Sequence, residues 1–142
     1  MLLSLAIISG LAALSQGYVL TAYKNVDDCK AEGDTNYRIY EGDFDGCQKF
    51  GGQSGSTCTE YSNGGTIGPN ACSSDVWEVH SVALDGKTQI SGAQLCYTCT
   101  YYTDEHCGSL NQSPQWYCDG WEAGPKSFQC LEEAFGALIM KT

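Results

Sequence analysis

The sequence predicts a mainly β protein: a small disulfide-stapled β-sandwich or Greek-key-like domain of two related β-units, with a short C-terminal helix. Three observations predict it: many cysteines after an apolar N-terminus, Tyr- and Thr-rich runs broken by Gly and Asp turns, and a cysteine spacing that occurs twice. The nine cysteines are Cys29, Cys47, Cys58, Cys72, Cys96, Cys99, Cys107, Cys118 and Cys130.

The N-terminus indicates export. Residues 1–14 are nearly all apolar, and this run is too short to span a bilayer, which takes about 20 apolar residues. Small residues follow at Ser15 and Gly17, so we expect residues 1–17 to be a signal peptide, with cleavage after Ser15 as the alternative. Residues 18–142 then form a single secreted, extracellular cysteine-rich β domain that is free of the membrane after signal removal.

The charge balance restricts the partners. The chain carries 17 acidic and 7 basic residues, a formal net charge of −10. Nucleic-acid binding needs a basic surface that replaces counterions, so we expect no nucleic-acid partner.

Four segments have the composition of strands: residues 18–23, 36–40, 75–84 and 95–102. Residues 51–70 are rich in Gly, Ser, Thr and Asn, and we expect a long surface loop pinned by Cys58 and Cys72. Apolar residues recur at helical spacing from Leu131 to Ile139, which predicts the C-terminal helix.

The cysteines contain an internal repeat. Ten residues separate Cys47 from Cys58, and ten separate Cys107 from Cys118; a third cysteine follows in each half, Cys72 and Cys130. Similar turns, residues 40–46 and 102–108, lie just before or at the start of each set. We expect these six cysteines to staple two related units, with Cys29 bonded to Cys96 or Cys99. The odd number leaves either a free thiol or an intermolecular disulfide.

The candidate metal and redox motifs favour structural interpretations. Cys96 and Cys99 have CxxC spacing, but on a strand their thiols point to opposite faces, so we expect neither a dithiol nor a zinc site. Glu41, Asp43 and Asp45 imitate the start of a calcium loop, yet the twelfth position is Gly52 rather than a bidentate carboxylate. We expect no metal and no cofactor.

Candidate functional side chains are few. Trp116, Tyr117 and Trp121 are the candidate ligand-binding residues, since exposed rings can stack on sugars, although packing against a disulfide is an alternative. Glu78, His80 and Arg38 supply the side-chain types of a ribonuclease-like site, but a surface pair on one strand face also explains Glu78 and His80. We therefore assign no catalytic residue.

The signal peptide, the spaced cysteines and runs such as YEGDFDGC and YYTDEHCGS resemble fungal small secreted cysteine-rich proteins, many of which are candidate effectors. The Tyr-to-Gly turns, with Ser81 and Ser127 near the end of each unit, also resemble the Greek-key motif of βγ-crystallin-like domains. In this chain the second aromatic comes one residue early, His106 replaces it in the second unit, and the calcium-site sequence of that family is not recognisable.

The resemblance to fungal secreted proteins implies an extracellular binding protein that acts on a host or a competitor. Its partner would be an extracellular protein or a polysaccharide. A carbohydrate-binding module and a small secreted hydrolase such as a ribonuclease are the alternatives.

Overall fold

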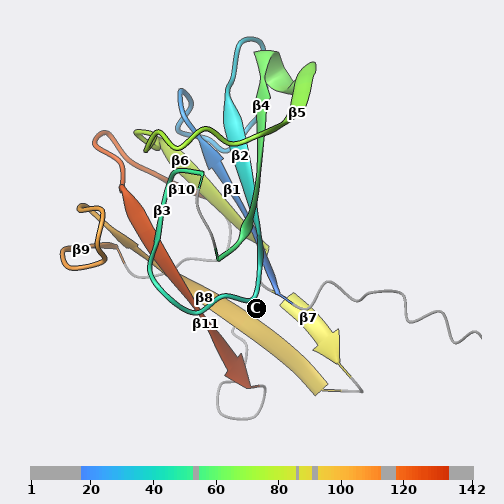
Figure 1. Cartoon of the computed structure of the whole chain (residues 1–142), viewed down its shortest axis with the longest axis vertical. Coiled ribbons are helices and arrows are strands. Elements are labelled where there is room, and N and C mark those ends of the chain that lie inside the picture. Colours follow the sequence, from blue (N-terminus) through green and yellow to red (C-terminus); the bar gives the residue numbers. More distant parts are fainter. Residues whose placement is uncertain (1–16, 53–54, 86, 91–92, 113–117, 135–142) are drawn as a thin grey trace, which may run out of the picture.

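The computed structural model describes residues 17–52, 55–85, 87–90, 93–112 and 118–134, and these form eleven strands and one short 3-10 helix (Figure 1). The elements are β1 (Tyr18–Tyr23), β2 (Tyr37–Gly42), β3 (Gln48–Lys49), β4 (Thr57–Ser62), η1 (Asn63–Gly65), β5 (Ile67–Ala71), β6 (Ser81–Asp85), β7 (Lys87–Ile90), β8 (Ala93–Tyr102), β9 (Leu110–Gln112), β10 (Cys118–Gly120) and β11 (Ser127–Ala134). Within these residues no helix has the length and apolar character needed to cross a membrane.

Two antiparallel sheets enclose an aromatic core. One sheet has the order β10-β6-β1-β2-β4-β5, and the other has the order β3-β11-β8-β7, with β9 also paired to β8. Alternate residues of β1, Tyr18, Leu20 and Ala22, are buried because successive side chains of a strand point to opposite faces. The ring of Tyr18 packs edge-on against Tyr97 and Phe128 of the second sheet, which joins the two layers.

The two units, which run from β1 to β6 and from β7 to β11, exchange strands. In the first unit β1 pairs with β2 and β6, while β3 leaves to pair with β11 of the second unit. In the second unit β8 pairs with β9 and β11, while β10 leaves to pair with β6 of the first. Each unit therefore completes the other's sheet, and β4 and β5 form an added hairpin beside β2. The prediction of two related, Greek-key-like β-units is confirmed.

Two serines at equivalent places fix the loops that follow β1 and β8. The Ser81 hydroxyl accepts from the backbone N–H of Cys29 at 3.2 Å and donates to the carbonyl of Val26 at 2.6 Å. The Ser127 hydroxyl accepts from the N–H of Cys107 at 3.1 Å and donates to the carbonyl of Asp104 at 2.6 Å. Both cysteines have φ of 56°, a left-handed conformation that these hydrogen bonds help to hold.

Four disulfides join the described residues: Cys29–Cys118, Cys47–Cys107, Cys58–Cys72 and Cys99–Cys130. The first two bonds are reciprocal. Cys29–Cys118 ties the loop after β1, which Ser81 fixes, to β10 of the second unit. Cys47–Cys107 ties the loop after β8, which Ser127 fixes, to the residue just before β3 of the first unit. Cys58–Cys72 closes the added hairpin, and Cys99–Cys130, which is fully buried, joins β8 to β11.

The expected partner of Cys29 was wrong, since Cys29 bonds Cys118 rather than Cys96 or Cys99. Cys47 and Cys107 were matched as equivalent members of a repeat, yet they bond each other. The equivalent positions are Cys29 with Cys107 and Cys47 with Cys118. The four pairs leave Cys96, whose backbone lies in β8 and whose side chain is outside the described part of the chain.

Three predictions of local structure need correction. Residues 51–70 are not one loop, because they contain β4 and most of β5. Residues 75–80 are not a strand; only the end of the predicted 75–84 segment belongs to β6. Leu131–Ala134 continue β11 alongside β8 and are not helical, because ladder hydrogen bonds override the local helical spacing. Residues 135–142 of the predicted helix lie outside the described residues.

We predict that Ser127→Ala lowers the free energy of unfolding by about 1–3 kcal/mol, because it leaves the half-buried N–H of Cys107 and the carbonyl of Asp104 without a partner. Urea unfolding of the oxidised protein measures this. Ser74→Ala, at an exposed serine, is the control and should change stability by less than about 0.5 kcal/mol. Equal effects in the two variants would contradict the role of Ser127.

Candidate functional site

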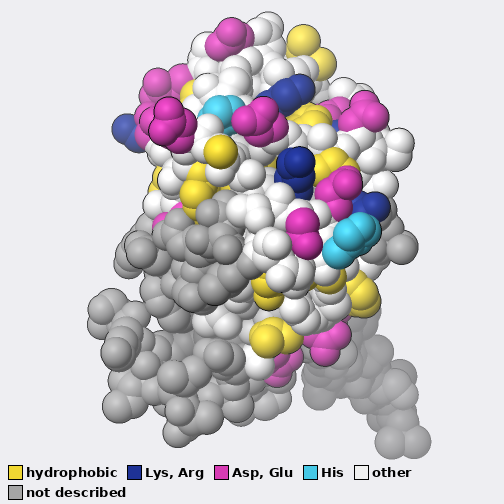
Figure 2. Space-filling view, turned by 90° about the vertical axis from the view of Figure 1, so that its left-hand side faces the viewer, with side chains coloured by type: hydrophobic (Ala, Val, Ile, Leu, Met, Phe, Trp, Pro, Cys, Tyr) yellow, Lys and Arg dark blue, Asp and Glu magenta, His cyan; other side chains and the backbone are white. Residues whose placement is uncertain are grey.

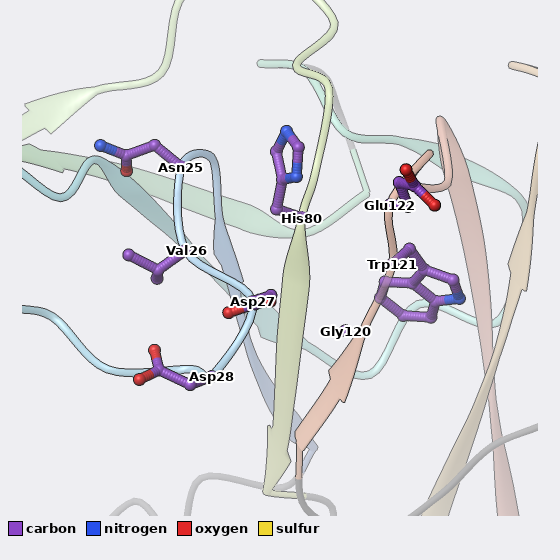
Figure 3. Close-up of a pocket in the computed structure, with 8 residues that line it drawn as sticks. All are labelled: Asn25, Val26, Asp27, Asp28, His80, Gly120, Trp121 and Glu122. Carbon is purple, nitrogen blue, oxygen red and sulfur yellow. The ribbon is translucent and has the colours of Figure 1, made fainter.

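A hollow of about 880 Å³ lies where the two units meet, beside the Cys29–Cys118 disulfide. Its eight lining residues come from three segments, as Figure 3 shows. The loop after β1 supplies Asn25 to Asp28, the position just before β6 supplies His80, and the end of β10 with the two residues after it supplies Gly120 to Glu122. His80 stands between the other two segments in this view. The hollow is thus built from both units.

Covalent and backbone bonds hold these walls in place. Cys29 directly follows one wall and Cys118 precedes the other, so their disulfide ties the two walls together. The backbone N–H of Trp121 donates to the carbonyl of His80 at 2.8 Å, and the N–H of His80 donates to the carbonyl of Tyr23 at 2.8 Å. The shape of the hollow is therefore set by the fold.

The lining of this hollow is acidic. Asp27, Asp28 and Glu122 are all exposed, and none of them is ion-paired to a described residue. None of the eight lining residues is a lysine or an arginine. On the face shown in Figure 2, acidic side chains are spread over the described surface with single basic side chains between them. The electrostatic potential over this face is therefore negative.

Trp121 is the aromatic member of the lining. Its half-buried indole packs edge-on against Tyr101, with ring centroids 5.3 Å apart, so the core positions it. Its Nε1 is buried with no hydrogen-bond partner among the described residues. Burial, and then the nearby Asp119 carboxylate, raise the pKa of Tyr101 well above its usual range, so this neighbour stays a neutral phenol.

Of the three predicted ligand-binding residues, the structure places Trp121 in the hollow. Trp116 and Tyr117, which precede β10 in the chain, lie outside the described residues. A binding role for these three side chains stays a prediction.

Arg38 is buried in the core and does not belong to this site. Its Nε donates to Glu60 at 3.0 Å, one terminal nitrogen donates to the carbonyls of Phe50 and Asp75, and the other donates to the carbonyl and the hydroxyl of Ser73. The guanidinium carbon lies 4.0 Å from the ring centroid of Trp77. All five N–H groups have an acceptor, so Arg38 has no donor left for a phosphate.

The residues considered for a ribonuclease-like site therefore do not act together. Arg38 is fully buried, Glu78 is exposed, and His80 lines the acidic hollow. The expectation that Glu78 and His80 lie on one strand face was wrong, because neither residue is in a strand.

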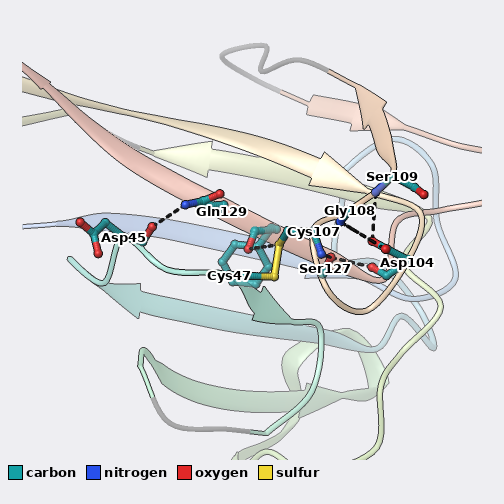
Figure 4. The surroundings of a disulfide bond; sticks show 9 residues. Asp45, Cys47, Asp104, Cys107, Gly108, Ser109, Ser127 and Gln129 are labelled. Carbon is teal, nitrogen blue, oxygen red and sulfur yellow. Dashed lines mark hydrogen bonds between the residues drawn. A yellow bond between two sulfur atoms is a disulfide. The ribbon is translucent and has the colours of Figure 1, made fainter.

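A second hollow, of about 570 Å³, lies at the reciprocal disulfide Cys47–Cys107. Its lining differs in charge, because Lys49 and His106 accompany Glu105, and Phe44, 40% exposed, is also among the lining residues. Figure 4 shows how Asp104 holds the loop after β8, which contains Cys107: its carboxylate accepts from the N–H of Gly108 at 2.9 Å and from the N–H of Ser109 at 3.3 Å. These bonds hold the pKa of Asp104 below its usual range.

Metal binding has no assembled site among the described residues. No cluster of three or more His, Cys, Asp or Glu side chains there is arranged to hold an ion. The acidic turn of Glu41, Asp43 and Asp45 is exposed, and Gln129 donates to the backbone carbonyl of Asp45 at 2.8 Å.

Sequence reasoning missed the loop residues Asn25 to Asp28 as part of a site. Their signal was weak: two adjacent acids before a cysteine, with nothing to show that β10 of the other unit would lie opposite.

No protein family model matches the chain, and comparisons with curated proteins and with solved structures found no match.

We predict that Arg38→Ala lowers the free energy of unfolding by about 3–5 kcal/mol, because it leaves Glu60 and three buried or half-buried carbonyls without their cation. Arg38→Lys should recover only part of the loss, since an ammonium cannot reproduce the planar fork. Chemical unfolding measures both variants, with Lys126→Ala at an exposed lysine as the control. Full stability in Arg38→Lys would contradict the role of the fork.

Proposed function

We propose that this protein is a secreted, disulfide-stabilised extracellular binding protein, and that the acidic hollow beside Cys29–Cys118 is its binding site. Four disulfides in a small β domain fit a stable protein of the extracellular type. The observation that carries the binding site is the hollow itself, walled by both units and tied by a disulfide.

The preformed walls support binding. Ligand sites are commonly concave and formed before the ligand arrives, so that little ordering is required on association. The disulfide and the backbone bonds of His80 and Trp121 provide that rigidity. The resemblance to fungal small secreted cysteine-rich proteins adds the proposal that the partner belongs to a host or a competitor.

A carbohydrate-binding module is the second candidate. Trp121 lines the hollow next to carboxylates, an amide and an imidazole, and this mixture of an aromatic ring and polar groups also suits a sugar. A hydrolase has less support, because Arg38 is buried in the core, where it pairs with Glu60, and cannot reach a substrate phosphate.

We predict that the oxidised, secreted protein captures a partner through the hollow. The charge-reversal variant Asp28→Lys/Glu122→Lys changes two exposed lining residues and should lose capture by at least about tenfold. The matched control Asp43→Lys/Asp45→Lys makes the same change in net charge on the exposed acidic turn and should keep capture.

The measurement uses immobilised protein and two pools: soluble extracellular host proteins and insoluble cell-wall polysaccharides. Capture of one protein that the Asp28→Lys/Glu122→Lys variant loses supports the effector-like proposal. Retention on a polysaccharide that this variant loses supports the second candidate. Equal loss in both variants, or no capture from either pool by the unmodified protein, contradicts the proposal.

A further inference from the structure

We propose that the hollow beside Cys29–Cys118 binds an arginine side chain of a basic protein segment. This inference rests on the proposed function, because it names the ligand chemistry of the same site. It is carried by the combination of an indole ring and unpaired carboxylates in one preformed hollow.

The molecule already contains an arginine site of this chemistry. In the core, the guanidinium of Arg38 lies 4.0 Å from the ring centroid of Trp77 and donates to the Glu60 carboxylate at 3.0 Å. A guanidinium is well suited to such a place, because it stacks on an aromatic face and donates from a planar fork. An indole and a carboxylate are thus two of the groups that hold an arginine within this fold, together with the carbonyls of Phe50, Asp75 and Ser73.

The hollow offers the same two groups without an internal cation. Trp121 is half-buried in the lining, and Asp27, Asp28 and Glu122 are exposed around it and not ion-paired to a described residue. Lys24, which directly precedes the lining loop, is directed elsewhere: its ammonium lies 5.3 Å from the ring centroid of Trp77. The acceptors of the hollow therefore remain available to a cation from outside.

The charge of the whole chain favours the same ligand. With 17 acidic and 7 basic residues, the protein attracts a basic segment and repels an acidic one before contact. Arginine is preferred to a sugar as the occupant because three exposed carboxylates around the hollow attract a cation and offer a neutral sugar no such attraction.

The test is an NMR titration of the ¹⁵N-labelled, oxidised, secreted protein. The probes are N-acetyl-arginine methylamide and N-acetyl-citrulline methylamide, which has nearly the same shape but no charge. We expect the arginine probe to shift the amides of residues 25–28 and 120–122 and the indole N–H of Trp121. The citrulline probe should bind at least about fivefold more weakly.

A matched pair of variants locates the effect. Asp27→Asn/Asp28→Asn/Glu122→Gln should weaken the arginine response by at least about fivefold. Glu41→Gln/Asp43→Asn/Asp45→Asn changes the net charge by the same amount on the exposed acidic turn and should keep the response. Shifts confined to the hollow, with this pattern, support the inference.

Three results would overturn it: equal binding of citrulline, equal weakening in both variants, or a response of these residues to a neutral oligosaccharide but not to arginine. The capture experiment is independent of this one. Hollow-dependent capture without an arginine response leaves the proposed function standing and rejects the ligand. An arginine response without capture supports the ligand and rejects the proposed function.

Discussion

The exchange of one strand between the two units, locked by two reciprocal disulfides, is the constraint on which the rest of the molecule depends. β3 and β10 are only two and three residues long, too short to hold the two units together by their own hydrogen bonds. Cys47–Cys107 and Cys29–Cys118 close sequence separations of 60 and 89 residues, and loops of that length correspond to roughly 4 kcal/mol of chain entropy each. Each bond acts on a loop that a serine hydroxyl already fixes, so covalent and hydrogen bonds reinforce the same contacts. The acidic hollow exists because these loops and exchanged strands are brought face to face.

The second organising interaction is the buried guanidinium of Arg38. It joins β2 to the segment between β5 and β6 through Asp75, Ser73 and the ring of Trp77, where the chain has no regular strand to hold it. A buried charge is tolerated only when its donors are satisfied, and here all five are. Because Arg38, the single arginine of the sequence, is fully buried, it is not available to bind a ligand at the surface. Among the described residues, the hollow combines exposed carboxylates with Trp121, and this lining is the basis of the proposed binding function.

Much of the fold could be predicted from local sequence. The Tyr18–Tyr23 strand was predicted with its observed bounds, because its alternating β-branched and aromatic residues match a half-buried strand. Ser81 and Ser127 were also singled out, and both fix a loop. The disulfide partners of Cys29 and of Cys107, which are Cys118 and Cys47, could not be predicted, because equal spacing along the chain does not reveal which cysteines are equivalent in space. The repeat suggested by the spacing matched Cys47 to Cys107, whereas strand exchange makes them partners. The hollow was missed for the same reason: its walls are distant in sequence, and of its lining only Trp121 and His80 had been noted, for two different functions.

Disulfide mapping of the secreted, non-reduced protein by proteolysis and mass spectrometry is the most direct test of the strand exchange. We expect cross-linked peptides that join Cys29 to Cys118 and Cys47 to Cys107, and peptides that join Cys58 to Cys72 and Cys99 to Cys130. A bond from Cys29 to Cys96 or Cys99, or from Cys47 to Cys58, would show that the two units do not exchange strands in this way. The hollow built between them would then lose its basis.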